Sequence, residues 1–528
     1  MESTTPQGSK SLSQCTTPRN NSYAQSEKQD LEKQVSSEEP TQSSTENKPS
    51  PFPETDLSRG IVGWEGQDDP NNPQNFPEGK KLALLGLISA FTFISPLASS
   101  MFAPAVGFMA VDFRETNETL LSFTVSVFLI GYTFGPCFLA PLSEIYGRRI
   151  VFSSANWFFV VWQIGCALAP NIETEIICRF FAGIGGAGCI TLGAGVIADL
   201  FPVEQRGKAT AIWGLGPLIG PVAGPIAGGF IGQEAGWRWA FWVLLIAGGV
   251  MAGLIEVFNQ ETFAPVLIRW KMEKLAKETG RTDLRSAYDE EKAAGPVGVK
   301  QALKSGLMRP FVLLVKSPIV LLLSTYMALV YGLLYLFFTT ISSVFRTKYG
   351  FSAGLSGLAY LGIGIGFIAG IAFTASTNDK ILLKLTARNG RFEPEMRLPL
   401  MIFFASILPI SFFWYGWTVY YDIHWIVPII GMFPFGVAMI GVYIPIQTYV
   451  IDCYPKYAAS ANATLTATRS LVGGLLPLAG PKMFESLGLG WGNSLLGFLA
   501  LAFVPIPIVF TRYGKVIRER WPVDLDRI

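Results

Sequence analysis

Hydrophobic residues along this chain gather into twelve apolar windows separated by polar stretches. Each window runs for roughly twenty residues or more, the length that a helix needs to cross a bilayer. The pattern therefore predicts an all-α polytopic membrane protein with twelve transmembrane helices. The windows begin near Leu82, Thr119, Ile150, Ile176, Ala209, Trp239, Ile319, Ala353, Leu398, Ile426, Ala458 and Ser494.

One polar interruption is far longer than the others and divides the windows six and six. It follows the sixth window, at Asn259, and contains the charged run from Arg269 to Lys274. The N-terminal segment is rich in Ser, Thr, Gln, Glu and Pro, which is typical of disordered tails, and it has no apolar signal-peptide core. The predicted organisation is a disordered tail 1–79, a six-helix half 80–258, a central loop 259–317, a six-helix half 318–512 and a tail 513–528.

Basic residues in the short loops favour one side of the membrane. Lys and Arg concentrate in cytoplasmic loops, so the richer side is predicted to be cytoplasmic, together with the central loop and both termini. Asn117-Glu-Thr119 then falls in an outer loop, which makes Asn117 a candidate glycosylation site. The richer side carries Arg148, Arg149, Arg206, Lys208, Lys380, Lys384, Arg388, Arg391, Arg397 and Lys456, and the other side carries Arg114, Arg238, Arg346 and Lys348.

The fifth window contains a regular glycine pattern. Its glycines recur every four residues and lie along one helical face, where the missing side chains let a neighbouring backbone approach closely. Three prolines follow the same period, although each costs roughly 3 kcal/mol inside an isolated helix. Neighbouring helices must then satisfy the carbonyls that the prolines free, so the pattern predicts a kinked helix-packing seam. The seam comprises Gly216, Gly220, Gly224, Gly228 and Gly232, with Pro217, Pro221 and Pro225.

Glycines and prolines recur at the same helix offset in the two halves. Such matches are expected when two six-helix halves face one another across a central substrate site. The second and eighth windows share Gly131 and Gly135 with Gly362, Gly366 and Gly370, and the fifth and eleventh share Gly220, Pro221 and Pro225 with Pro477, Gly480 and Pro481.

Composition narrows the function. The 528 residues carry a formal net charge of only +2, so no concentrated basic surface is available for nucleic acid. The single histidine, His424, excludes histidine metal clusters and a Ser/His/Asp triad, and the six cysteines show no zinc-site spacing. The glycines from Gly183 to Gly188 have the spacing of a dinucleotide-binding fingerprint. We dismiss this match because no strand precedes them and they lie in an apolar crossing. We predict no cofactor, no metal, no nucleic-acid partner and no enzymatic activity.

Two arginines lie well inside predicted crossings, Arg179 in the fourth and Arg469 in the eleventh. A central arginine costs roughly 2.5 to 3.5 kcal/mol, so each must face protein or water. No Asp or Glu lies near the centre of any window. The cavity is therefore predicted to be electropositive and to prefer neutral or anionic substrates over permanent cations. For Arg469 an alternative stays open, in which it only bonds carbonyls or a broken helix end.

Aromatic and polar residues of the seventh and tenth windows are candidates for a substrate cavity. Flat, amphipathic side chains such as tyrosine suit flat hydrophobic ligands. The alternative is that these residues only pack between helices. Together with Arg469, the candidate cavity residues are Tyr331, Tyr335, Phe338, Tyr443 and Gln447.

The loop between the second and third windows contains a carboxylate, a turn glycine and two arginines, in the run from Pro141 to Arg149. Together with the run from Arg179 to Gly188 and the glycine seam, it resembles the major facilitator superfamily. More narrowly, the set is similar to the fungal twelve-helix drug:proton antiporters. The resemblance covers about Lys81 to Arg512, is most specific from Gly131 to Arg149, and extends to Glu261–Pro265 and Arg397–Pro399.

The resemblance implies roles for individual residues. Glu144 and Arg148 would belong to a charge relay with Asp199, at the end of the fourth helix, and Arg179 would take part in proton coupling. A proton carrier must change charge, and without an intramembrane histidine a carboxylate is needed. Asp199 is the predicted carrier. The antiporter motif would comprise Gly216, Gly220, Pro221, Gly224, Pro225 and Gly228.

The resemblance implies a secondary active transporter of the major facilitator fold. We expect export of small hydrophobic or amphiphilic compounds, such as drugs, toxins or secondary metabolites, by proton antiport across the plasma membrane, as in multidrug resistance. Its partners would be a small-molecule substrate, protons and the lipid bilayer, and it would act as a monomer. The alternative is proton-coupled or facilitative uptake of a polyamine, sugar or vitamin. A membrane sensor and a membrane acyltransferase are the candidates from other classes.

Overall fold

The computed structural model describes residues 52–290, 299–454 and 458–523. Within these ranges, 11 segments are long and apolar enough to cross a membrane, and the last, Ser460–Arg520, has 61 residues. Its backbone leaves the helical conformation at Gly488, with φ 71 and ψ 172. A Cβ on Gly492 would lie 2.6 Å from the Phe484 ring, whereas residues eight apart in a straight helix are separated by about 12 Å. The chain therefore folds back at Gly488, and the twelve predicted crossings are confirmed.

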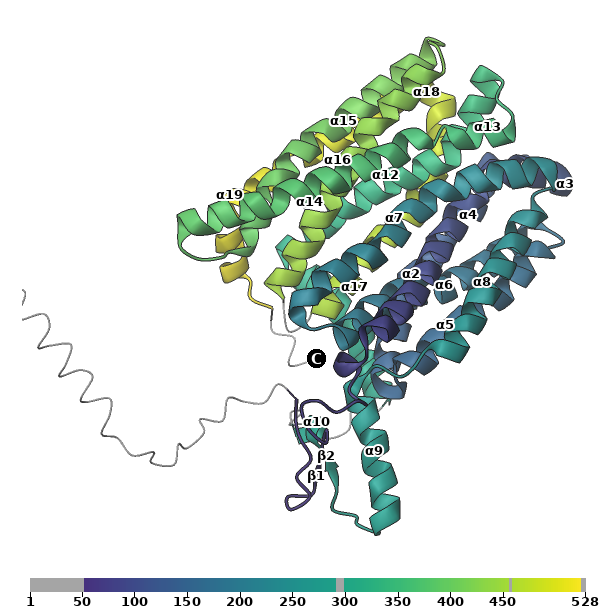
Figure 1. Ribbon diagram of the computed structural model, residues 1–528. Coiled ribbons are helices and arrows are strands. Elements are labelled where there is room, and N and C mark those ends of the chain that lie inside the picture. The colour runs from purple at the N-terminus through teal and green to yellow at the C-terminus, as the bar shows by residue number, and fades with distance from the viewer. Residues whose placement is uncertain (1–51, 291–298, 455–457, 524–528) are drawn as a thin grey trace, which may run out of the picture. The chain divides into compact units, whose positions relative to one another are not determined.

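The first six crossings are six long helices that lie together in Figure 1, coloured from purple to teal. A short helix, α3 (Val106–Phe113), follows the first crossing through the 3₁₀ turn Ala103–Ala105. The crossings are α2 (Glu78–Met101), α4 (Glu118–Tyr146), α5 (Arg148–Ala167), α6 (Ile172–Leu200), α7 (Val203–Glu234) and α8 (Arg238–Phe258).

The second six crossings use more helical segments, because three of them are interrupted. The eighth is α13 followed by α14, the eleventh is α17 and the first part of α18, and the twelfth is the rest of α18 with α19 (Figure 1). The bounds are α12 (Pro318–Tyr349), α13 (Ala353–Leu358), α14 (Leu361–Asn389), α15 (Pro399–Tyr420), α16 (Ile426–Cys453), α17 (Ala458–Leu475), α18 (Gly480–Phe503) and α19 (Pro505–Arg520).

Equivalent helices pack in the same way in the two halves. In the N-terminal half, a Cβ on Gly135 of α4 would lie 2.9 Å from the Ile184 carbonyl of α6. In the C-terminal half, a Cβ on Gly370 of α14 would lie 2.9 Å from the Val437 carbonyl of α16. The second helix thus packs on the fourth, and the eighth on the tenth, which confirms the predicted repeat for this pair.

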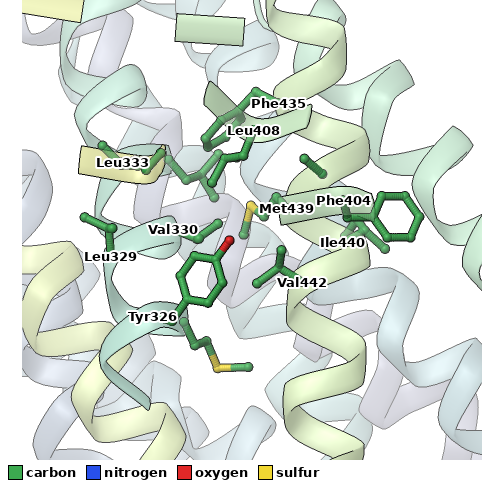
Figure 2. Close-up of a cluster of buried hydrophobic side chains, with 14 of the residues drawn as sticks. Tyr326, Leu329, Val330, Leu333, Phe404, Leu408, Phe435, Met439, Ile440 and Val442 are labelled. Atoms are coloured by element: carbon green, nitrogen blue, oxygen red, sulfur yellow. The ribbon is translucent and has the colours of Figure 1, made fainter. Parts of the chain in front are cut away.

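The core of the C-terminal half lies between α12, α15 and α16. Figure 2 shows Val330 and Leu333 of α12 directed toward Leu408 of α15 and Met439 of α16. All four side chains are buried, and they belong to one continuous apolar cluster. This packing fixes α12, which also carries the tyrosines considered below.

The glycine seam of α7 packs against α2 within the same half. A Cβ on Gly224 would lie 2.5 Å from Ser100 Oγ and 2.7 Å from the Leu97 carbonyl oxygen. Pro225 lacks the N–H that would bond the Pro221 carbonyl, and the Ser100 hydroxyl donates to that carbonyl at 2.8 Å instead. The predicted close packing and the satisfied carbonyl are confirmed, and α7 stays one continuous helix through its three prolines.

The crossings alternate, so the helix ends form two sets. We call the end that carries Arg148, Arg397 and the central segment the basic end; it is the end predicted to be cytoplasmic. The other end, which carries Asn117, Asn171 and Gly350, is called the opposite end. Both names refer to the molecule alone.

Residues 52–79 were predicted to belong to a disordered tail, and this is wrong for the part that the structure describes. Strand β1 (Ile61–Val62) pairs in parallel with β2 (Arg285–Ser286) of the central segment. Trp64 is buried and its Nε1 donates to the Tyr288 hydroxyl at 3.0 Å. An apolar partner that lies more than 200 residues away orders this segment, and a local composition argument does not detect it. Residues 1–51 lie outside the described residues.

The central loop is also largely helical. It contains α9 (Ala264–Thr279), α10 (Ala287–Glu290) and α11 (Val299–Lys316). Ile268 of α9 packs with Val62 and Trp64 in a small apolar cluster. The charged run predicted as loop thus forms a helix with one apolar face, which covers the N-terminal segment.

Candidate functional site

At the basic end, Arg148 and Asp199 form the predicted ion pair. Arg148 Nε lies 3.3 Å from Asp199 Oδ2, and both side chains are largely buried. Arg148 Nη1 also donates to Ser143 Oγ at 2.5 Å, and Thr262 Oγ1 donates to Asp199 at 3.4 Å. The cluster therefore joins the ends of α4, α5 and α6 to the segment after α8. Ionic and hydrogen-bonded contacts of this kind hold helix ends in one arrangement.

Glu261 completes this cluster, and Glu144 does not enter it. The Glu261 carboxylate accepts the backbone N–H groups of Arg148 at 2.8 Å and Arg149 at 3.1 Å, which are the first residues of α5. A carboxylate at a helix N-terminus satisfies free N–H groups and complements the helix dipole. Glu144 is exposed, and within the described ranges its side chain makes no ion pair or hydrogen bond.

The C-terminal half repeats this ion pair. Arg397, just before the ninth crossing, pairs with Asp452 at the end of the tenth. Arg148 and Asp199 hold the equivalent positions, before the third crossing and at the end of the fourth. Arg518, after the twelfth crossing, adds an ion pair to Glu395 at 3.2 Å. Both halves thus tie their helix ends with the same device at the basic end.

Deeper in the N-terminal half, Arg179 of α6 is buried among main-chain carbonyls. Its Nη2 donates to the carbonyls of Ala98 at 3.4 Å, Ser99 at 3.2 Å and Val125 at 3.4 Å. Three phenylalanine rings surround the guanidinium, with centroids 5.4 to 5.7 Å from its central carbon. Its Nε has no hydrogen-bond partner among the described residues. The arginine therefore links α6 to both α2 and α4.

One turn before Arg179 lies Glu175, a carboxylate that the sequence prediction missed. Its side chain is fully buried, and neither carboxylate oxygen has a hydrogen-bond partner among the described residues. The fourth window was drawn from Ile176, so Glu175 fell one residue outside it. The available signal was its spacing, because residues four apart on a helix lie on the same face.

A hydroxyl pair connects the two halves beside Arg179. Ser99, whose carbonyl accepts from Arg179, shares a hydrogen bond of 2.7 Å between its Oγ and the Tyr335 hydroxyl of α12. Both side chains are buried. Tyr335 was predicted as a cavity residue, and Ser99 was not. A run of serines within an apolar window was the signal for it.

Arg469 of α17 lies between two tyrosine rings. Its guanidinium carbon is 5.0 Å from the ring centroids of both Tyr331 and Tyr443, and Nη1 donates to the Tyr443 hydroxyl. Tyr331 in turn packs against Tyr335, with centroids 5.2 Å apart. Arg469 Nε has no partner in the described part of the chain. The structure thus brings four of the predicted cavity residues together: Tyr331, Tyr335, Tyr443 and Arg469.

The two remaining predicted cavity residues lie at the margins of this group. The Phe338 ring packs edge-on against the Tyr335 ring, with centroids 5.3 Å apart, and at a tilt against the Tyr360 ring, with centroids 5.5 Å apart. Gln447 Nε2 donates to Asn462 Oδ1 at 3.0 Å. Phe338 therefore supports Tyr335 from behind, and Gln447 joins α16 to α17 near Arg469.

A narrow gap lies between Tyr331 and Tyr443, and it is too small to hold even a water molecule. Ligand pockets usually measure about 300 to 1,000 Å³, so this space is too small for a drug-sized molecule. Its lining is apolar except for the two tyrosine hydroxyls. The lining residues are Met327, Val330, Tyr331, Met439, Val442 and Tyr443.

The two halves meet tightly at the opposite end. A Cβ on Gly229 of α7 would lie 2.6 Å from the Ala353 carbonyl oxygen, and one on Gly357 of α13 would lie 2.5 Å from that of Pro225. The Gly354 N–H also donates to Gln233 Oε1 at 3.1 Å. Backbone packs on backbone here, so the path between α7 and α13 is closed at this end. Helix α7 thus packs on α2 through its glycine seam and on α13 through a different face.

Asn117, the predicted glycosylation site, is the N-cap of α4. Its Oδ1 accepts the backbone N–H groups of Thr119 at 3.1 Å and Leu120 at 3.2 Å. The residue is exposed at the opposite end. Its glycosylation stays a prediction.

Comparison with known proteins agrees with the helical arrangement. Residues 88–477 match the model of the Major Facilitator Superfamily. The chain is 50% identical over 459 residues to the MFS-type transporter penM of Penicillium rubens, covering 87% of this chain and 89% of that protein. It is 48% identical over 458 residues to the MFS transporter cpaT of Aspergillus oryzae, covering 87% and 91%.

A solved structure shares the fold. The xylose transporter XylE from E. coli, in a partially occluded inward open conformation, matches with a TM-score of 0.61 over 83% of this chain and 98% of XylE. At 18% sequence identity this likeness concerns the fold alone.

Proposed function

This chain belongs to the Major Facilitator Superfamily of membrane transporters, and we propose that it exports small hydrophobic or amphiphilic compounds in exchange for protons. The family makes it an integral membrane protein with a small-molecule substrate. The direction of transport, the coupling to protons and the class of substrate are the proposal. We further propose a monomer in the plasma membrane, with the basic end and both termini in the cytoplasm.

The environment of Arg469 carries the proposal on substrate class. Its charge is buried between the rings of Tyr331 and Tyr443, and its Nη1 donates to the Tyr443 hydroxyl. A buried guanidinium with an unpaired Nε attracts an acceptor or an anion. The rings supply flat apolar contact. A flat compound with an acidic or acceptor group fits this chemistry better than a permanent cation.

Transport requires that the closed arrangement open. The gap between Tyr331 and Tyr443 is too small for such a compound, and the opposite end is sealed between α7 and α13. Rocking of the halves would separate α12 and α17 from the N-terminal helices and open the region around Arg469. The Arg148–Asp199 and Arg397–Asp452 pairs would keep each half rigid while it moves. Asp199, predicted from sequence to carry the proton, is engaged in this packing, and we assign it to the helix-end cluster.

Proteoliposomes with an acidic lumen test the proposal. The probes are an anthracene bearing a sulfonate and an anthracene bearing a trimethylammonium group, so size is matched and neither charge titrates. Potassium with valinomycin holds the membrane potential at zero. An antiporter of either orientation exchanges lumenal protons for the external sulfonate, which accumulates inside. Protein-free vesicles are the control.

Three outcomes contradict the proposal in different ways. Accumulation that survives collapse of the pH gradient contradicts proton coupling. Preference for the trimethylammonium probe contradicts the role of Arg469. Accumulation only when the exterior is acidic indicates proton symport, which is the uptake alternative. One solved neighbour is a proton:xylose symporter, again at 18% identity, so this alternative rests on the shared fold alone.

A further inference from the structure

The Glu175 carboxylate makes no hydrogen bond and no ion pair with any described residue. It is fully buried in α6. An ionised carboxylate without partners in an apolar interior costs several kcal/mol or more, so a carboxyl in this position keeps its proton. Glu173, half a turn earlier on the same helix, is exposed. Burial therefore distinguishes Glu175 from its neighbour of the same type.

The groups that face Glu175 come from three helices. Arg179 lies one turn further along α6, and the charge of Arg238, at the start of α8, also acts on this carboxyl. Arg238 is itself paired with Asp112 of α3 at 3.0 Å. The thiols of Cys166 in α5 and Cys178 in α6 complete the set. Neither arginine forms an ion pair with Glu175 within 4 Å in this arrangement. Ionisation of the carboxyl would attract both arginines toward it.

Arg179 connects this carboxyl to the boundary between the halves. Its Nη2 donates to the carbonyls of Ala98 and Ser99 in α2 and of Val125 in α4. The Ser99 hydroxyl shares its hydrogen bond with Tyr335 of the C-terminal half. Movement of the guanidinium toward Glu175 would release the Ser99 carbonyl and loosen the serine that contacts Tyr335.

We propose that Glu175 is the residue that binds the transported proton, and that Arg179 passes its charge state to the Ser99–Tyr335 contact between the halves. The inference rests on the proposed proton antiport. A proton from water adds to a Glu175 oxygen while the opposite end is open. The neutral carboxyl frees Arg179 to bond the α2 and α4 carbonyls, and the closed arrangement seen here results. The proton leaves again after the basic end has opened, and the ionised carboxylate draws Arg179 back.

The decisive comparison is Glu175→Gln against Glu173→Gln in the full chain. Glutamine mimics the protonated carboxyl in shape but binds no proton. Glu175→Gln should lower gradient-driven uptake of the anthracene sulfonate at least about tenfold. The variant has no group at this position that binds a proton in one conformation and releases it in another, so the pH gradient cannot drive the change between them. Exchange of lumenal for external anthracene sulfonate without a gradient should continue, since exchange needs no net proton movement. Glu173→Gln should leave both activities unchanged.

The outcomes separate this inference from the function on which it rests. Driven uptake by Glu175→Gln at the wild-type rate overturns the role of Glu175 and leaves antiport standing. Absence of driven uptake by the wild type contradicts antiport itself. If Glu175→Gln does not fold, the wild-type protein is treated with dicyclohexylcarbodiimide, which reacts with protonated carboxyls in apolar surroundings. Mass spectrometry should find the adduct on Glu175 and not on Glu173, more at low pH; an unmodified Glu175 overturns the proposal.

Discussion

The two deep arginines of this transporter lie in contrasting surroundings. Arg179 is bonded to three main-chain carbonyls, surrounded by phenylalanine rings and preceded by a buried carboxyl one turn earlier. Arg469 is held by tyrosine rings and a hydroxyl beside a narrow gap. Both arginines are buried at a similar cost in free energy. Arg179 lies among carbonyls and near a carboxyl that could replace them as its partner, whereas Arg469 lies among tyrosines that could also contact a ligand.

This difference suggests a division of labour between the halves. In the proposed mechanism, a proton alters the packing of α2, α4 and α6 through Arg179. A substrate contacts Arg469, whose Nε has no partner among the described residues. The Ser99–Tyr335 hydrogen bond is where the two environments meet. Variants that damage one environment and spare the other can break or sharpen this comparison.

The largest effect is expected from Gly224→Leu in the seam of α7. The added side chain would collide with Ser100 and Leu97 of α2, next to the carbonyls that hold Arg179. Overpacking costs about 1 to 3 kcal/mol, so the free energy of unfolding should fall by that amount, and driven uptake of the anthracene sulfonate should reach background. Gly214→Leu is the matched control, because nothing lies within 4 Å of its Cβ. Normal uptake by Gly224→Leu would show that α2 and α7 need not pack closely.

A smaller and more selective effect is expected from Arg469→Met. Methionine keeps much of the apolar bulk but removes the charge. Uptake of the anthracene sulfonate should fall about 10- to 100-fold, since a hydrogen bond to a charged group contributes about 1.5 to 3 kcal/mol. Binding of the trimethylammonium probe should not fall. Equal losses for the two probes would assign Arg469 to packing, the alternative that its sequence context left open.

Tyr335→Phe tests the contact between the two environments. The substitution removes the Tyr335 hydroxyl, which is hydrogen-bonded to Ser99 Oγ, and keeps the ring that packs on Tyr331 and Phe338. A buried hydrogen bond contributes about 0.5 to 1.5 kcal/mol net, so the closed arrangement should lose stability and driven uptake should change by about two- to tenfold. Tyr326→Phe is the control, because the Tyr326 hydroxyl has no partner in the described ranges. An unchanged rate for Tyr335→Phe would remove this contact from the coupling path.

The smallest effect on transport is expected from Thr119→Ala, which tests the orientation of the protein in the membrane and so the side from which Glu175 receives its proton. If the opposite end is extracellular, Asn117 should carry a glycan, and Thr119→Ala should remove the glycan without altering transport. The variant keeps the Asn117 side chain that caps α4. Electrophoretic mobility before and after glycosidase treatment measures this. A wild-type protein whose mobility does not change would leave the orientation to labelling of single cysteines at each end.

The sequence alone determined the features that depend on local pattern. Twelve apolar windows predicted twelve crossings, and glycines four residues apart predicted the α7 seam, because a helix repeats its faces with a fixed period. The polar context of Arg469 suggested either a ligand or a packing role. These features need no knowledge of which distant segments meet. The pairing of Arg148 with Asp199 does need such knowledge, and it came from the resemblance to a known family.

The tertiary structure decided the features that depend on distant partners. Trp64 orders the segment predicted as disordered because Tyr288 and Ile268 lie against it. Glu261, rather than Glu144, holds the start of α5 because the segment after α8 returns to that helix end. Glu175 became a candidate only once its burial was known, since an exposed and a buried glutamate look alike in a sequence. Neighbouring helices determine which side chains are buried. Burial favours the protonated form of a carboxyl and makes the charge of an arginine energetically costly.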